Sequence, residues 1–465
     1  MVEEKQPHLL GSPSMPDGKG DKLFLTLGIM GLFFIFAVFV SLNLKTGIAP
    51  DEPAHFLFSK HYATTLGIPP DTEETQRTGW YIQHNPFLYY WVNGRAYAIM
   101  RWIKPDISDW RALQGLRLLS VIYSVLSLWV LYRSSRLLIE NIWLQRLPVF
   151  LLSNTLMFVF ISGAVSYDPM AILFCFTGAY FLIRAFKLDK FWKNSLLSLL
   201  MLGLGCLVKY PVTPFAFITV ISWLIFFFKN HTQLPKLEIK PNFVLLLVVA
   251  IVLLANVILY GQNLILYRGL TPDCMELFTK AQCELSPYYQ RAVAIGLPDK
   301  PNLLESIRQG GPTPLAYFLG SWNWLMLQSI YGILAHIDYE PKHVISFFQA
   351  FYLVIALLAA RFIKKIDHPW AYIILLSAFY STVVFFTNIS SELAFNYTHA
   401  AAIQGRYLFP TIGLGYLLVT WVISYVKNSW TRLSIISLTV LLFLYSGPIE
   451  FIINWNGIFK DWFIH

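Results

Sequence analysis

The sequence predicts an all-α polytopic membrane protein, and two observations decide this fold class. Hydrophobic residues make up 56% of the 465 residues and charged residues only 13%, a composition that excludes a soluble globular protein. Apolar stretches of about 17 to 22 residues recur along the whole chain, long enough to cross the roughly 30 Å hydrocarbon layer as helices. We therefore expect about eleven transmembrane helices.

The predicted spans follow one another from a polar N-terminal tail, residues 1–22. The first span is long and lacks a small-residue cleavage site, so we expect a retained anchor and one transmembrane domain over residues 23–465. The spans are residues 23–43, 112–133, 147–165, 169–186, 194–208, 212–228, 242–262, 343–361, 370–387, 407–426 and 432–452.

Lysine and arginine determine the predicted orientation. If the N-terminus is cytoplasmic, every inner segment is basic, including "RFIKKIDH" and "KNSWTR". This topology accounts for the formal net charge of +9, which is spread over separate loops, so we predict no nucleic-acid partner. Residues 44–111 and 263–342 then become two long outer loops, which we expect to cover the functional site.

The four cysteines agree with this topology. Cys175 and Cys206 fall inside spans, where a free thiol behaves as a small hydrophobic group. Cys274 and Cys283 share the second outer loop and are candidates for a disulfide on an oxidising outer face. Their spacing alone does not decide between a disulfide and two free thiols.

Three titratable residues stand together directly after the first span, in "IAPDEPAHF": Asp51, Glu52 and His55. One interpretation is a helix start, because Asp caps helices, Glu suits the helix dipole and Pro fits the first turn. On such a helix, which we expect to lie on the outer surface, Asp51 and His55 share a face and could hold one proton or one metal ion. Ionisable groups beside hydrocarbon are costly, which favours a functional site.

A second acid, Asp168 in "SYDP", lies between the third and fourth spans. Alone it is typical of a helix cap followed by proline. The topology, however, places it on the same face of the membrane as Asp51. Two carboxylates in different environments can take different roles, as general acid, general base or metal ligand.

Two cations occur where the positive-inside rule does not favour them. Arg406 in "QGRYLFP" and Lys209 in "LVKYP" stand at the outer ends of the tenth and fifth spans. Each could extend to the headgroups as an ordinary interfacial residue. The alternative is that they bind a lipid-borne phosphate, for which Arg has the bidentate geometry and Lys the charge.

The outer loops are also rich in aromatic residues. We expect most of them to belong to the interfacial belt and a few to form flat platforms for a sugar or a lipid. The segment "QHNPFLYYW" adds polar groups ahead of an aromatic run. The candidate substrate-binding residues are His55, Gln83, His84, Asn85 and Tyr89.

Together these motifs resemble the GT-C superfamily of integral membrane glycosyltransferases. That superfamily contains protein O-mannosyltransferases, the lipid A aminoarabinose transferase and the oligosaccharyltransferase catalytic subunit. The resemblance rests on "PDEPAH", "QHNPFLYY", "SYDP" and "QGRYLFP", between residue 50 and about residue 410, and is strongest to a bacterial branch. It implies that a sugar passes from a polyprenyl-phosphate carrier to an extracytoplasmic glycolipid, polysaccharide or protein, with inversion, at a bacterial cytoplasmic membrane.

The resemblance also implies residue roles. Asp51 would be the general base, Glu52 the neighbouring acid and Asp168 the second acid, which in some members helps to hold a divalent metal. Arg406 would bind the carrier phosphate. Metal dependence stays open: oxygen ligands from Asp51 and Asp168 would favour Mg²⁺ or Mn²⁺, whereas His55 or His84 would admit Zn²⁺.

Two other classes of protein remain alternatives. A secondary transporter or flippase of lipid-linked sugars also needs many helices, but it usually shows internal repeats and ionisable residues near mid-membrane. A non-catalytic subunit of an envelope assembly machine would keep the helices without needing acids at the outer face.

Overall fold

The computed structural model describes residues 21–236, 239–294, 303–334, 338–339, 342–394 and 403–464. Helices dominate these residues, and the only strands among them are the two-residue pair β1 (Ile333–Leu334) and β2 (Asp338–Tyr339). The predicted all-α membrane fold is therefore confirmed.

Ten helices of the described chain are long and apolar enough to cross a membrane. Each corresponds to one of the predicted spans, although α10, α20 and α21 do not cover the whole of the spans predicted at 212–228, 407–426 and 432–452. They comprise α1 (Asp21–Asn43), α5 (Asp109–Leu138), α8 (Asp168–Phe186), α9 (Phe191–Val208), α10 (Thr213–Asn230), α11 (Ile239–Tyr267), α18 (Lys342–Arg361), α19 (His368–Ala394), α20 (Phe409–Ser424) and α21 (Ser429–Leu444).

The remaining predicted span, residues 147–165, is broken. Here α6 (Leu147–Ser153) and α7 (Leu156–Ser162) meet at an angle of 65°. Asn154 and Thr155 stand at the break and donate side-chain hydrogen bonds to the carbonyls of Phe150 and Leu151, at 2.8 and 2.9 Å. The Thr155 hydroxyl satisfies the Leu151 carbonyl at the bend, as a membrane interior requires, whereas the Phe150 carbonyl also keeps a helical partner, the Asn154 amide, at 3.1 Å.

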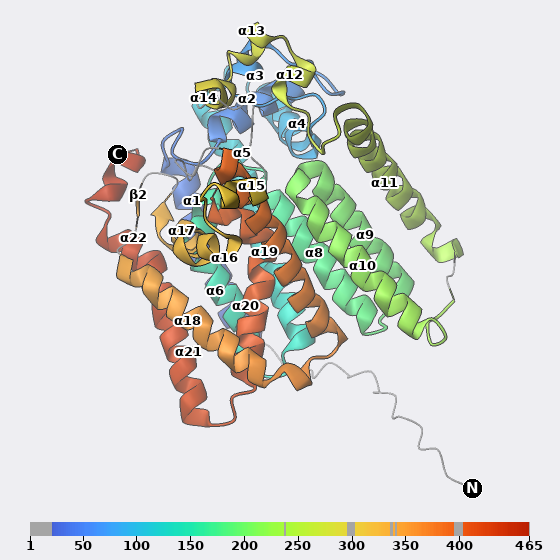
Figure 1. Cartoon of the computed structure of the whole chain (residues 1–465), viewed down its shortest axis with the longest axis vertical. Coiled ribbons are helices and arrows are strands. Elements are labelled where there is room, and N and C mark those ends of the chain that lie inside the picture. The colour runs from blue at the N-terminus through green and yellow to red at the C-terminus, as the bar shows by residue number, and fades with distance from the viewer. Residues whose placement is uncertain are drawn as a thin grey trace.

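Burial separates a central group of spans from a peripheral one. The helices α8 and α20 are the most buried spans, and α11 is the least buried. Contacts join α8 to α9, α5 and α20, so this group forms the centre of the bundle. In Figure 1, α11 stands at the edge of the molecule, where its apolar side chains can face lipid.

Short helices from both long loops gather at one end of the bundle (Figure 1). The loop between α10 and α11 and the loop between α20 and α21 lie at the opposite end. The first long loop forms α2 (Glu52–Ala63), α3 (Glu73–Arg77) and α4 (Leu88–Ile103). The second forms α12 (Cys274–Leu277), α13 (Lys280–Cys283), α14 (Pro287–Ala294), α15 (Leu303–Arg308), α16 (Pro314–Tyr317), η3 (Phe318–Trp322) and α17 (Asn323–Tyr331). We call α12 to α14 the outer cap.

Several single turns complete the chain. They include η1 (Leu144–Arg146), η2 (Tyr210–Val212), η4 (Ile363–Lys365), η5 (Gly405–Leu408), η6 (Tyr445–Ile449), α22 (Glu450–Ile453) and η7 (Ile458–Trp462).

The turn η5 matters most for the site because it is packed tightly against α17. The Gly405 amide donates a hydrogen bond to Ser329 Oγ at 2.6 Å. A Cβ atom on Gly405 would lie only 2.8 Å from the backbone nitrogen of Ile330, so only glycine permits this approach. The contact fixes the backbone immediately before Arg406.

Candidate active site

Asp51 occupies the junction between α1 and α2, and its carboxylate does not cap α2. Its backbone is left-handed, with φ 59° and ψ 6°, a conformation that Asp tolerates better than most residues. No side-chain capping bond is formed. The carboxylate instead contacts Arg406, with Oδ2 2.5 Å from Nη2, so the helix starts here as predicted but the Asp51 side chain does not cap it.

Four charged side chains form one ion-pair cluster: Asp51, Asp168, Lys209 and Arg406. Beyond the contact of Arg406 with Asp51, its Nη1 lies 3.6 Å from Asp168 Oδ2. Lys209 Nζ lies 2.6 Å from Asp168 Oδ1. Asp51 keeps 18% of its side-chain surface exposed, whereas the other three keep between 2 and 5%. The cluster therefore holds two acids and two cations, mostly out of water.

Separate elements bring these four residues together. Asp168 begins α8, Lys209 stands in the break between α9 and η2, and Arg406 lies in η5 directly before α20. Ser166 helps to hold Asp168, because the Ser166 hydroxyl donates to Asp168 Oδ2 at 3.2 Å. All four residues of the cluster thus lie at, or directly beside, the end of a membrane-spanning helix.

A second, fully buried ion pair holds the loop that carries Asp51. Arg117 of α5 binds both carboxylate oxygens of Glu52, at 2.7 and 2.5 Å, and both side chains have no exposed surface. Arg117 also donates to the Leu44 carbonyl at 2.7 Å, and Glu52 Oε1 accepts the Val165 amide at 2.9 Å. The pair therefore ties the end of α1, the start of α2 and the turn before Asp168 to α5.

This arrangement corrects the expected role of Glu52. Its carboxylate is enclosed and engaged by Arg117 and Val165, so it has no oxygen left to meet a substrate. Arg117, which sequence reasoning missed, had one signal: it is an arginine inside a predicted span, where charge is costly unless paired.

His55 lies beneath the cluster as a neutral side chain. Burial lowers the pKa of His55 to about 4, although the charge of Asp51 acts in the opposite direction. Its Nδ1 is 2.9 Å from the Tyr90 hydroxyl, and its ring centroid lies 4.5 Å from that of Tyr167 and 5.0 Å from that of Trp80. His55 therefore packs against three aromatic side chains, Trp80, Tyr90 and Tyr167, which line a cavity beside the cluster.

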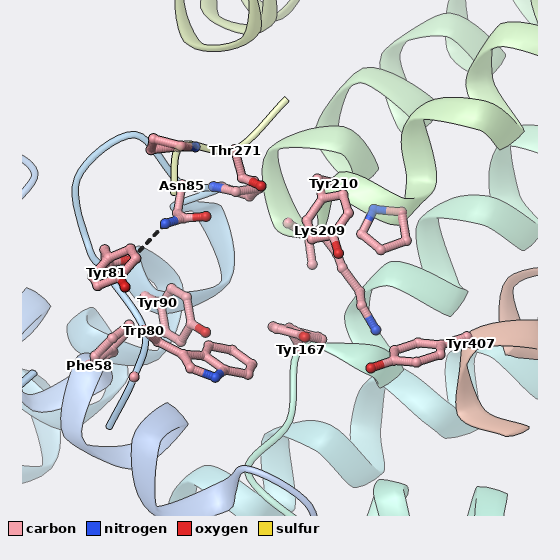
Figure 2. A pocket seen from close by; sticks show the side chains of 15 residues that line it. Phe58, Trp80, Tyr81, Asn85, Tyr90, Tyr167, Lys209, Tyr210, Thr271 and Tyr407 are labelled. Atoms are coloured by element: carbon pink, nitrogen blue, oxygen red, sulfur yellow. Dashed lines mark hydrogen bonds between the residues drawn. The ribbon is translucent and has the colours of Figure 1, made fainter. Parts of the chain in front are cut away.

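A cavity of about 270 Å³ opens beside Lys209. Figure 2 shows Trp80, Tyr81 and Asn85 on one side of it and Lys209 and Tyr210 on the other. The Lys209 ammonium lies 4.4 Å from the ring centroid of Tyr167 and 5.1 Å from that of Tyr407. The full lining consists of Phe58, Gly79, Trp80, Tyr81, Asn85, Pro86, Tyr90, Tyr167, Val208, Lys209, Tyr210, Pro211, Thr271, Pro272 and Tyr407.

Only one of the five candidate substrate-binding residues, Asn85, lines this cavity, and its amide donates to the Tyr81 carbonyl at 2.9 Å. Gln83 is exposed away from the cavity. His84 has a left-handed backbone, with φ 61°, and its Nε2 faces the Tyr267 hydroxyl at 3.5 Å. Tyr89, like His55, is buried behind the lining of the cavity.

Most cavity residues were not singled out as substrate-binding, among them Trp80, Tyr167 and Tyr407. The sequence signal for the two tyrosines was adjacency, because they directly neighbour Asp168 and Arg406. Trp80 is one of the aromatic residues of the first long loop, and composition alone does not show which of these lie in the interfacial belt and which form a platform.

The cluster does not suit a divalent metal ion. Asp51 and Asp168, the expected metal ligands, each already hold a cationic side chain, and a divalent ion between them would lie against Arg406 and Lys209. No group of three or more His, Cys, Asp or Glu side chains that could hold a metal exists in the described part of the chain. Metal dependence was left open by the sequence, and the residues present do not fit a divalent ion at this position.

The outer cap covers Asp51. A disulfide joins Cys274 to Cys283, with Cα atoms 5.8 Å apart, and links α12 to α13. Just beyond it, the Tyr288 hydroxyl lies 3.5 Å from Asp51 Oδ1. The ring of Tyr288 packs on Gly79 so closely that a Cβ atom there would clash, and Gly79 also needs its φ of 79°. The two long loops thus meet over the cluster.

Part of the chain is similar to a known protein family. Residues 98–260 match the family model of dolichyl-phosphate-mannose-protein mannosyltransferases. The predicted resemblance to the GT-C superfamily is confirmed. Those matched residues include Asp168, Lys209 and Arg117 but not Asp51 or Arg406. No curated protein matches the whole sequence significantly.

Two solved membrane enzymes align with most of this chain at low identity. The Archaeoglobus fulgidus oligosaccharyltransferase AglB, in complex with an inhibitory peptide and a dolichol-phosphate, is 12% identical over 91% of this chain and 55% of its own, with a TM-score of 0.49. ArnT from Cupriavidus metallidurans, bound to undecaprenyl phosphate, is 13% identical over 88% of this chain and 61% of its own, with a TM-score of 0.42. The AglB complex with Zn and sulfate is 13% identical, with a TM-score of 0.48. The chain thus spans little more than half the length of these proteins.

Proposed function

We propose that this protein is a GT-C membrane glycosyltransferase. It transfers a sugar from a polyprenyl-phosphate carrier to an acceptor hydroxyl on the extracytoplasmic face. The observation that carries the proposal is the ion-pair cluster, where one partly exposed carboxylate, Asp51, and two cations, Lys209 and Arg406, stand beside an aromatic cavity. The family match over residues 98–260 supports the same reaction class.

The reaction needs little beyond positioning and two charges. A glycosyl phosphate already carries a good leaving group, so the enzyme must orient an acceptor oxygen and remove its proton as bonding develops. Asp51, the acid of the cluster that keeps contact with solvent, accepts that proton. The acceptor oxygen attacks the anomeric carbon while the bond to the phosphate oxygen breaks. A single displacement of this kind inverts the anomeric centre.

Arg406 and Lys209 stabilise the carrier phosphate as its negative charge grows. Guanidinium and ammonium groups bind phosphate strongly when they are held out of water. Asp168 orients both cations through its two carboxylate oxygens. Asp168 is therefore a positioning residue in this mechanism, not a second base.

The aromatic cavity would hold the sugar. Flat aromatic faces bury the apolar faces of sugars, and Trp80 and Tyr167 are stacked with an interplanar angle of 23°. Asn85 and Thr271 place an amide and a hydroxyl on the same lining, where they can meet sugar hydroxyl groups.

The position of the cluster favours a transferase over a transporter. Transporters bind their cargo near mid-membrane between repeated halves. The ion-pair cluster instead stands at the ends of spans, and Tyr288 of the second long loop lies over Asp51. We place this end outside the cytoplasm, in a bacterial cytoplasmic membrane with the N-terminus inside, because every predicted inner loop is basic.

A transfer assay tests the proposal. Purified full-length protein is incubated with labelled polyprenyl-phosphate sugars and a panel of glycolipid, polysaccharide and protein acceptors. We expect transfer by the wild type, and a loss of at least about 100-fold in Asp51→Asn, because general-base catalysis contributes roughly 10²–10⁴-fold. The matched control is Asp109→Asn, which removes an exposed carboxylate, paired with Lys60, at the start of α5. Undiminished transfer by Asp51→Asn would refute Asp51 as the base, whereas no transfer by the wild type to any acceptor would favour a non-catalytic role for this chain.

A further inference from the structure

Both cations of the ion-pair cluster are already engaged by side chains of the protein. Arg406 donates from Nη2 to Asp51 and from Nε to Gln404 Oε1 at 2.6 Å, and its Nη1 faces Asp168. Lys209 donates to Asp168. The two acids and two cations balance each other before any ligand enters. Arg406 Nη1 has no hydrogen-bond partner, but a phosphate that binds the guanidinium through both Nη1 and Nη2 must take the place of the Asp51 carboxylate at Nη2.

The Asp51 contact is the one most open to exchange. Asp168 is 4% exposed, begins a span, and is held by both Lys209 and Ser166. Asp51 is 18% exposed and lies on the loop side of the cluster. Its second oxygen, Oδ1, is within 3.5 Å of the Tyr288 hydroxyl, which can keep the carboxylate in place after Arg406 has turned away.

We propose that the carrier phosphate competes with Asp51 for Arg406, so that donor binding itself releases the general base. This inference rests on the proposed function and adds an order of events to it. With no donor bound, Arg406 holds Asp51. When the donor enters, the Arg406 guanidinium moves to the phosphate and the Asp51 carboxylate is left to the acceptor hydroxyl.

Because of this exchange, the basicity of the Asp51 carboxylate depends on whether the donor is bound. A carboxylate that keeps a guanidinium partner is a weaker base than a free one, because the cation stabilises its charged form. Asp51 then takes the acceptor proton, the anomeric C–O bond to the phosphate breaks, and the bond from the acceptor oxygen forms. The carrier leaves as a phosphate monoester, Asp51 returns its proton to water, and the contact with Arg406 forms again.

The competition predicts an unusual binding result for the base variant. Polyprenyl phosphate without a sugar is titrated into full-length protein in phosphatidylcholine nanodiscs. If Asp51 competes for Arg406, Asp51→Asn should bind the lipid phosphate at least about tenfold more tightly than the wild type, a gain of about 1.4 kcal/mol. Asn suits the left-handed backbone at this position, so the variant should fold. Asp51→Gly, which fits the same φ, removes the carboxylate independently.

Matched variants separate competition from general charge. Asp109→Asn adds the same unit of positive charge at an exposed site and should leave the affinity unchanged. Arg406→Gln should weaken binding of polyprenyl phosphate at least about tenfold, because it removes a charge-assisted contact. Polyprenol, which lacks the phosphate, reports binding of the tail alone and should bind all variants equally.

The outcomes distinguish this inference from the proposed function. If both Asp51 variants bind polyprenyl phosphate no more tightly than the wild type, while Arg406→Gln binds it weakly, the competition is refuted and the phosphate site stands. If the wild type does not prefer polyprenyl phosphate to polyprenol, and Arg406→Gln changes nothing, the proposed function itself is refuted.

Discussion

The guanidinium of Arg406 lies 2.5 Å from the carboxylate of Asp51, although 355 positions separate the two residues. One residue follows the first span and the other precedes α20. Their contact therefore joins residues that are far apart in the sequence into a single charged site. It also makes each side chain dependent on the other, which gives the account several measurable consequences.

The buried pair of Glu52 and Arg117 should be a major contributor to stability. Glu52→Gln or Arg117→Met each leaves an uncompensated buried partner, so we expect each to lower the free energy of unfolding by about 3–5 kcal/mol. Thermal unfolding in detergent measures this. The matched control is Glu73→Gln, whose pair with Arg77 is exposed on α3 and should matter little.

The double variant Glu52→Gln/Arg117→Met provides the decisive comparison. Because the two side chains interact mainly with each other, the double variant should lose clearly less stability than the sum of the two single losses. Additive losses would mean that Glu52 and Arg117 act through other contacts.

His55 predicts a pH dependence of stability. Its pKa is about 4 in the folded protein and about 6.5 in an unfolded chain, so the unfolded state binds more protons between these values. Stability should therefore fall as the pH is lowered from about 6.5 to about 4, by roughly 3 kcal/mol at most. Unfolding midpoints across this range should show the loss in the wild type.

His55→Gln should remove most of that dependence, whereas His231→Gln, at an exposed residue after α10, should keep it. An unchanged pH profile in His55→Gln would show that another group dominates acid destabilisation.

The disulfide should matter to transfer more than to the bundle. Cys274 and Cys283 fix the outer cap that carries Tyr288, whereas the spans hold their own core. We expect the Cys274→Ser/Cys283→Ser variant to transfer several-fold more slowly, with a melting temperature close to that of the wild type. A reducing agent should slow the wild type equally and leave this variant unaffected. A reductant effect on the variant would locate the sensitivity elsewhere.

Transfer should not depend on a divalent cation. Arg406 and Lys209 stand where a metal ion would balance the carboxylates and the carrier phosphate. Dialysis against a chelator should leave the initial rate of transfer within about twofold of the untreated rate. A rate that collapses and returns with Mg²⁺, Mn²⁺ or Zn²⁺ would contradict this assignment of the two cations.

The spans and the charged cluster could be predicted from sequence for the same physical reason. Hydrocarbon tolerates only helices and penalises every charge, so apolar runs define the spans, and Asp51, Asp168, Lys209 and Arg406 stand out against them. The bend in the third span could not be predicted, because it depends on side-chain bonds at Asn154 and on tertiary packing.

Other assignments failed because they depend on pairing or on local backbone geometry. Glu52 looked like a catalytic acid until the fold supplied Arg117 as its partner. His84 and Gln83 lie in a turn whose left-handed residue directs them away from the cavity. Neither the pairing of Glu52 nor the left-handed turn at His84 leaves a periodicity or a composition in the sequence that would predict it.

The central claim is that the cluster binds a lipid-borne phosphate next to the base, and a structure of the protein with polyprenyl phosphate tests it most directly. The account predicts the phosphate within about 3 Å of the Arg406 guanidinium and close to Lys209, because charge-assisted hydrogen bonds have this length. A phosphate bound away from both cations, with Asp51 and Arg406 still paired beside an unaltered cluster, would contradict it.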